Sequence, residues 1–172
     1  MDNRPVQFKH FGTMVDMSRN AVMNVASVKQ WIDITADLGY NTLMLYTEDT
    51  FEVDGNPYFG YMRGRYSREE LKEINAYALK KEMELIPCTQ MLTHQNVCRR
   101  WPEYKEHYDV GDIFLVGDDR VYELIESMFR TMAECFTSRL VNIGMNEAHM
   151  LGRGKYYDQH GDANRFEICL ST

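Results

Sequence analysis

Four clusters of polar and charged side chains stand out along the chain, each directly after a short apolar run. In chain order the clusters contain Asp16, Ser18, Arg19 and Asn20; Glu48 and Asp49; Gln90 and His94; and Asn146, Glu147 and His149. Carboxylates and histidines are the side chains that most often exchange protons with a substrate, and arginine binds groups of oxygen atoms. Glu147 is the strongest single candidate, because it follows a glycine-containing apolar run.

The apolar runs before the clusters are predicted strands, over 12–15, 41–46, 84–88 and 140–145. Between them, apolar residues recur at helical spacing. These patterns predict a helix capped by Ser27 and ending at Gly39, one opened by a Ser67–Glu70 capping box, and one capped by Asp118 or Asp119; residues 165–168 begin another. Strands that alternate with helices predict an α/β fold with a parallel sheet or barrel.

In such a sheet or barrel the carboxyl ends of all strands face the same way, so the four clusters are expected to meet at one site. Each cluster alone also has a structural interpretation. Arg19 could be a surface cation, the Glu48–Asp49 pair could solvate a loop, and His94 could be a hydrogen-bonded core histidine. Four clusters in succession favour a site.

Composition excludes several classes of protein. The 172 residues carry a net charge of −7, which argues against nucleic acid and anionic membrane surfaces as partners. No run of about 18 apolar residues occurs, and no secretory signal is visible. The four cysteines have wide, irregular spacing and are predicted to be free thiols. A cytoplasmic protein is expected, with secretion open if the N-terminus is truncated.

Metal and nucleotide chemistry are the weaker alternatives. His94, His149, Glu147 and Asp49 could collect a divalent ion, but the chain has neither an H-x-H nor an H-E-x-x-H motif. The Gly152–Lys155 segment only partly matches a phosphate-binding loop. We therefore predict no metal and no cofactor.

Several strand-end motifs together resemble glycoside hydrolase family 20, the β-N-acetylhexosaminidases. The segments 12–20, 86–94 and 142–149 resemble the family's first-, third- and fourth-strand motifs. The sequences of segments 46–49 and 152–156 are most similar to those of a bacterial exo-β-N-acetylglucosaminidase branch of the family. The resemblance runs from about His10 to Ile168 and implies a single partial catalytic domain over 1–172, built as part of a TIM-type (β/α)8 barrel with about four βα units.

The resemblance implies hydrolysis of terminal β-linked N-acetylhexosamine from a glycan by a substrate-assisted retaining mechanism. Glu147 matches the general acid/base, and Arg19 matches the residue that binds the sugar hydroxyls. Asp49 and His94 match a supporting pair close to the general acid.

Two departures from the family pattern lead to further expectations. Asn146 stands where the family has a catalytic aspartate, so the residue keeps a hydrogen-bond acceptor but no charge. A closed barrel takes about 250 residues, which is more than this chain has. We therefore expect impaired turnover and self-association through open barrel edges. A non-catalytic hexosamine-binding remnant is the alternative.

Overall fold

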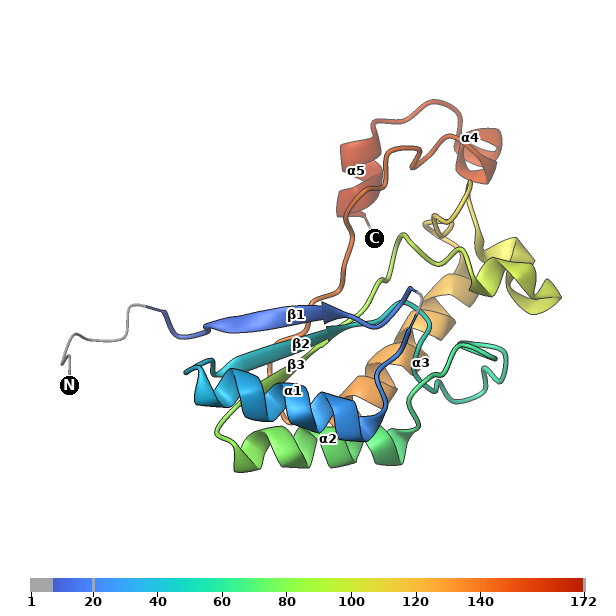
Figure 1. The fold of residues 1–172 in the computed structure, drawn as a ribbon. Coiled ribbons are helices and arrows are strands. Elements are labelled where there is room, and N and C mark those ends of the chain that lie inside the picture. The colour runs from blue at the N-terminus through green and yellow to red at the C-terminus, as the bar shows by residue number, and fades with distance from the viewer. Residues whose placement is uncertain (1–7, 20, 172) are drawn as a thin grey trace.

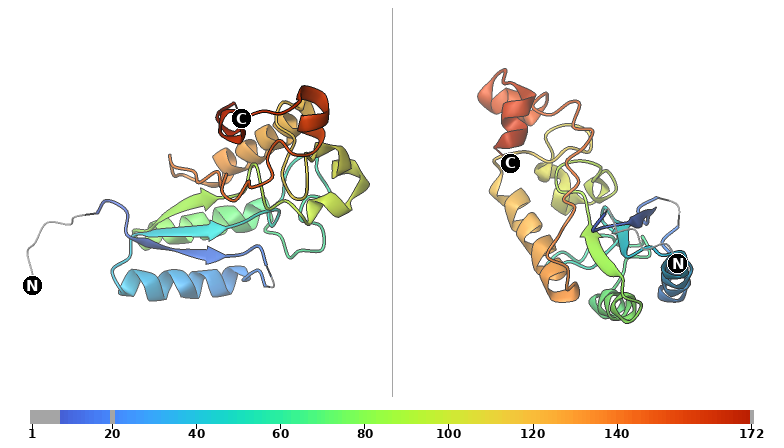
Figure 2. Two further views of the ribbon diagram at one scale, coloured as in Figure 1. Left: turned by 90° about the horizontal axis from the view of Figure 1, so that it is seen from above. Right: turned by 90° about the vertical axis from the view of Figure 1, so that its left-hand side faces the viewer.

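The computed structural model describes residues 8–19 and 21–171. A parallel three-stranded sheet in the order β1-β2-β3 forms its centre, and three long helices lie together on one side of the sheet (Figures 1 and 2). The strands are β1 (Gly12–Asp16), β2 (Thr42–Tyr46) and β3 (Glu84–Cys88), and the helices are α1 (Val25–Asp37), α2 (Arg68–Lys80) and α3 (Asp119–Cys135). The predicted α/β architecture is confirmed.

The helix starts follow local capping chemistry. Ser67 and Glu70 form the predicted reciprocal capping box of α2, and the Asp118 side chain caps α3 by accepting from the Arg120 amide. The predicted cap of the first helix is wrong. The Asn24 side chain accepts from the Ser27 amide at 2.9 Å, so α1 begins one turn earlier than expected.

The predicted fourth strand, 140–145, is not a regular strand. The segment runs parallel to β3 and joins it through one bridge, between Cys88 and Asn142. The Thr89 amide donates to the Asn142 carbonyl at 2.9 Å. Gly144 then has a φ of +51°, which turns the chain out of the extended conformation. The described chain thus has three complete βα units and a strand-like fourth segment.

The face of the sheet that points away from the helices is largely open. Thr13 of β1 points toward α1, where its hydroxyl accepts from the Trp31 indole at 3.1 Å. Since side chains alternate along a strand, Met14 and Asp16 project from the opposite face, and Met14 is 53% exposed. In a closed barrel this face would line the interior.

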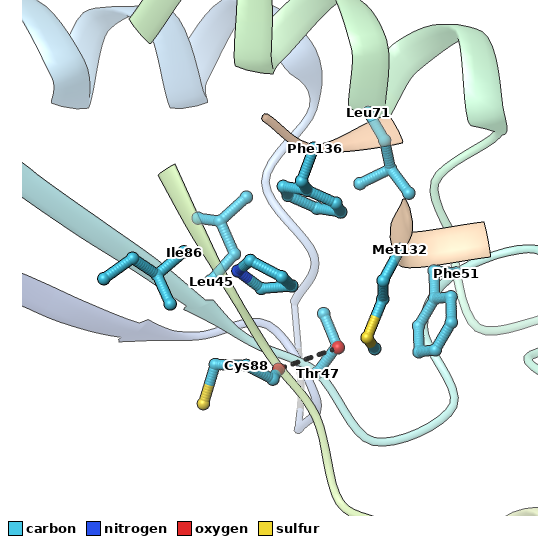
Figure 3. A pocket seen from close by; sticks show the side chains of 9 residues that line it. Leu45, Thr47, Phe51, Leu71, Ile86, Cys88, Met132 and Phe136 are labelled. Atoms are coloured by element: carbon cyan, nitrogen blue, oxygen red, sulfur yellow. Dashed lines mark hydrogen bonds between the residues drawn. The ribbon is translucent and has the colours of Figure 1, made fainter. Parts of the chain in front are cut away.

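Apolar side chains between the sheet and the helices form the main core. Figure 3 shows a small apolar pocket in this layer, lined by Leu45, Thr47, Phe51, Leu71, Ile86, Pro87, Cys88, Met132 and Phe136. The hydrogen of the Thr47 hydroxyl is donated to the Cys88 carbonyl at 3.0 Å (Figure 3). Burial raises the pKa of the Cys88 thiol to about 11, so the thiol stays protonated and unreactive. The pocket is packing space.

A second, smaller core includes the C-terminal helices α4 (Lys155–His160) and α5 (Arg165–Leu170), which lie away from the sheet (Figure 1). The Gly152–Lys155 segment leads into α4. The Asp109 carboxylate accepts from the backbone amides of Gly152 and Gly154 in this segment and of Tyr156 just after it, at 2.7–3.1 Å. A side chain of the protein therefore occupies the position that an anion would take in a phosphate loop.

Candidate functional site at the strand ends

An open hollow lies at the carboxyl ends of the strands. Figure 1 draws these strand ends as arrowheads. The residues that line the hollow come from all four strand-end clusters or the strands before them: Met14, Asp16, Arg19, Tyr46, His94, Asn146 and Glu147. Parallel strands bring these distant parts of the sequence to one edge. The structure thus brings together four of the five predicted site residues, namely Arg19, His94, Asn146 and Glu147.

Arg19 is held at one side of the hollow by an ion pair with Glu48. The Glu48 side chain is 2% exposed, whereas that of Arg19 is 55% exposed, so the guanidinium keeps donors free for a ligand. Burial raises the pKa of the Glu48 carboxyl, against the opposing attraction of Arg19. The buried Glu48 carboxylate therefore orients the Arg19 guanidinium, which itself remains accessible to solvent.

Tyr46 and Gln90 continue the network across the strand ends. The Tyr46 hydroxyl donates to Glu48 at 3.4 Å and accepts from the Gln90 amide at 3.0 Å. Burial, followed by the charge of Glu48, raises the pKa of Tyr46 to about 12, so it remains a protonated donor. The same Gln90 nitrogen donates to the Asn146 side-chain oxygen at 3.0 Å.

His94, Asn146 and Glu147 meet at the other side of the hollow. The His94 Nε2 atom lies 3.3 Å from Asn146 Nδ2 and 3.5 Å from Glu147 Oε2, and its Nδ1 atom lies 3.8 Å from Asp112. The Glu147 side chain is 64% exposed and points its carboxyl group at open space as well as at the imidazole. This geometry suits a proton donor to a ligand in the hollow.

The backbone at this side of the hollow is strained. His94 and Glu147 have φ values of +60° and +62°; among the described residues, the other non-glycine positions with positive φ are Met62 and Glu82. L-residues avoid this left-handed region, and such strain tends to cluster at functional sites. Two of these four residues line one hollow, which supports its assignment as a site.

Asp49, the fifth predicted site residue, does not line the hollow. Its side chain is 2% exposed and pairs with Arg63 Nε at 3.2 Å. Arg63 also donates to the backbone carbonyls of Ser18 and Arg19. Asp49 therefore pairs with Arg63, which holds the loop that carries Arg19, and it does not pair with His94 as the resemblance implied.

Two further members of the predicted clusters do not contribute to this hollow. His149 is exposed and lies beside other surface depressions, near Arg165 and Phe166. Asn20 lies outside the described residues. Within 8–19 and 21–171, no group of three or more His, Cys, Asp or Glu side chains is arranged to hold a metal ion. Over the same residues, no helix is long and apolar enough to cross a membrane.

The catalytic-domain model of glycosyl hydrolase family 20 matches residues 8–166. The chain belongs to glycosyl hydrolase family 20. Its curated relatives include a β-hexosaminidase of Akkermansia muciniphila, 24% identical over 80% of this chain, and human hexosaminidase D, 24% identical over 89% of this chain. The chain spans about a third of the length of either protein, 34% and 33% respectively.

Solved structures of β-N-acetylhexosaminidases share the fold of this chain. A mutant Streptomyces plicatus β-hexosaminidase in complex with the product GlcNAc is 25% identical, with a TM-score of 0.75 over 88% of this chain and 35% of that one. A Vibrio harveyi exo-β-N-acetylglucosaminidase, 19% identical, shares the fold with a TM-score of 0.78 over 94% of this chain and 32% of its own. The three-stranded sheet is consistent with part of the family 20 barrel.

Sequence reasoning placed Gln90 in the third cluster without giving it a role and did not single out Tyr46 or Thr93. In the structure Gln90 bonds to Tyr46 and Asn146, and the Thr93 hydroxyl donates to the Asn146 carbonyl. Tyr46 is the last residue of β2, and Gln90 and Thr93 follow β3. Their position at or just after a strand end was a usable signal. Their uncharged side chains gave no reason to prefer them over the charged neighbours Glu48 and His94.

Proposed function

We propose that this family 20 chain contributes to a glycosidase that removes terminal β-linked N-acetylhexosamine from glycans. The observation that carries the proposal is the shared hollow, where Arg19 lies opposite a His94–Asn146–Glu147 group. A guanidinium with free donors suits vicinal sugar hydroxyls, and an accessible carboxyl beside an imidazole suits proton transfer to a leaving oxygen.

The proposed reaction is the substrate-assisted, retaining one. The acetamido oxygen of the sugar attacks the anomeric carbon as the glycosidic bond breaks, and Glu147 gives its proton to the departing oxygen. An oxazolinium ion results. Water then attacks the anomeric carbon and returns a proton to Glu147, so that the product keeps the starting configuration.

Asn146 is the weak point of this mechanism. Its side chain offers an oxygen to the acetamido N–H but no charge to balance the cation that forms. Losing one such electrostatic partner typically lowers the rate about 10²- to 10³-fold. This observation favours a second candidate function, a hexosamine-binding protein with no turnover.

Hydrolysis of a chromogenic β-N-acetylglucosaminide, measured beside binding of free N-acetylglucosamine, tests both candidates. The enzyme hypothesis predicts slow release that Glu147→Gln abolishes and Asn146→Asp accelerates about 10²- to 10³-fold. The binding hypothesis predicts saturable binding that Arg19→Met weakens, without hydrolysis in any variant. Neither binding nor hydrolysis, in a folded protein, would refute both.

We further propose that the chain self-associates through its open sheet face and edges. Met14, Leu140, Val141 and Ile143 are apolar and 37–53% exposed along this region, and the outer edge of β1 has no partner strand among the described residues. Exposed strand edges and apolar patches favour association. Light scattering across a concentration series should show dimers or larger species, and a monodisperse monomer would refute this.

A cytoplasmic location is the remaining proposal. All four cysteines are free, and Cys88, Cys98 and Cys135 are buried. Free thiols are the usual state in a reducing compartment. Fractionation of the native cells, with detection of this chain, would test the location.

A further inference from the structure

Gly144 and Gln90 fit together in a way that fixes the Gln90 side chain. A Cβ atom at position 144 would lie 2.6 Å from the Gln90 side-chain amide and 2.4 Å from the Thr89 carbonyl oxygen. The Gln90 residue itself is 1% exposed. The amide group therefore packs against a bare backbone and has little room to move.

The hydrogen bonds of Gln90 then fix which way its amide points. Its Nε2 atom lies 3.0 Å from both the Tyr46 hydroxyl and Asn146 Oδ1, and its two hydrogens serve these two acceptors. The Thr93 hydroxyl donates to the Asn146 backbone carbonyl at 2.6 Å, so it does not decide the orientation of the Gln90 amide. The Tyr46 hydroxyl gives its one hydrogen to Glu48, so it can only accept from Gln90, and a flipped amide would place the Gln90 oxygen against that hydroxyl oxygen.

The orientation passes from Gln90 to Asn146 and then to His94. Because Asn146 Oδ1 accepts from Gln90, its Nδ2 atom faces His94 Nε2 at 3.3 Å. An amide nitrogen only donates, so His94 Nε2 must accept. A neutral His94 then carries its proton on Nδ1, on the side of Asp112. The charged or titratable groups around the imidazole are Asp112, Glu147 and, more distantly, Glu48.

We propose that Gln90 is a positioning residue that sets the amide orientation of Asn146 and, through it, the tautomer of His94 beside Glu147. Gln90 itself does not line the hollow. The functional consequence rests on the proposed glycosidase or sugar-binding activity: Gln90 would direct the Asn146 oxygen and hold an unprotonated imidazole nitrogen next to the acid. The orientation itself is testable without any ligand.

Nitrogen-15 NMR of labelled histidine in the 172-residue chain at pH 8 reads the tautomer directly. The native chain should show His94 protonated on Nδ1. In Gln90→Glu the new carboxylate only accepts, so Asn146 should turn its nitrogen toward residue 90 and its oxygen toward His94. The protonated-nitrogen signal of His94 should then move from Nδ1 to Nε2. Gln90→Met, which donates nothing, should give a mixture of both tautomers.

Two controls separate positioning from a simple charge effect. Gln30→Glu adds the same charge on an exposed face of α1 and should leave the His94 signals unchanged. In an Asn146→Ala background, Gln90→Glu should no longer switch the tautomer, because the connecting amide is gone. If either Gln90 variant fails to fold, the other decides.

Native-like His94 signals in a folded Gln90 variant, or a switch that persists without Asn146, would overturn the proposal. If neither Gln90 variant folds, the Asn146 link decides: Asn146→Asp, at an exposed position, must place the His94 proton on Nε2, and an unchanged Nδ1 proton would overturn it. A tautomer switch in a protein that neither binds nor hydrolyses N-acetylglucosamine would support the positioning role and reject the proposed function.

Discussion

Replacing Gly144 with alanine should destabilise the chain by far more than a typical glycine substitution. Two costs add at this position. The φ of +51° lies in the left-handed region, which costs an L-residue about 1–2 kcal/mol. The new Cβ would also lie 2.4 Å from the Thr89 carbonyl and 2.6 Å from the Gln90 amide, and overpacking of this kind costs about 1–3 kcal/mol.

Gly111 provides the matched control. Its φ is +59°, close to that of Gly144, but nothing lies within 4 Å of a Cβ built there. Gly111→Ala should therefore cost only the conformational part, about 1–2 kcal/mol. Gly144→Ala should cost about 2–5 kcal/mol in total.

Urea unfolding followed by circular dichroism measures both variants against the native chain. For a chain of this size, 1 kcal/mol corresponds to about 2–4 °C in the melting temperature, so the two variants should be resolved in a thermal melt as well. Equal losses for Gly111→Ala and Gly144→Ala would refute the argument that residue 90 and the Thr89 carbonyl occupy the space beside Gly144.

Three further substitutions test other parts of the site. Burial raises the pKa of Glu48 in the folded chain, so the folded state holds a proton that the unfolded state has already lost, and the free energy of unfolding should fall as pH rises above the ordinary carboxyl range. Glu48→Gln should flatten that fall in urea titrations, and parallel pH profiles for the two proteins would contradict this. Arg63→Met leaves the buried Asp49 carboxylate without its cation and should cost about 3–5 kcal/mol. Arg130→Met, which removes an exposed pair with Glu126, should cost about 0.5 kcal/mol or less in the same assay, and similar losses would argue against a buried Asp49 pair. Asp109→Ala removes the acceptor of three backbone amides and should cost about 2–4 kcal/mol by urea unfolding, with Asp109→Asn less affected; a neutral Asp109→Ala would show that water replaces the carboxylate.

The sequence predicted the elements whose signals are local. The Ser67–Glu70 capping box and the alternation of apolar runs with helical segments depend on neighbours within a few residues. The fourth segment could not be predicted in the same way. Residues 140–145 have the composition of a strand, but whether they form one depends on pairing with partners far along the chain.

The site was predictable to the level of strand ends but not of individual contacts. The rule that strand ends converge placed Arg19, His94, Asn146 and Glu147 together. It could not distinguish Glu48 from Asp49. Both are carboxylates at the same strand end, and only the local backbone conformation decides which direction each side chain takes. In the structure Glu48 faces Arg19 and Asp49 faces Arg63.

At Glu147 the left-handed backbone conformation lowers the stability of the fold, while the side chain is the one proposed to donate the proton. A glycine would relieve a conformational cost of about 1–2 kcal/mol, so Glu147→Gly should melt at a higher temperature than the native chain while losing the carboxyl group. Selection for thermal robustness alone would therefore tend to erase this glutamate. Directed-evolution screens of this chain would need to score ligand recognition or turnover alongside heat resistance.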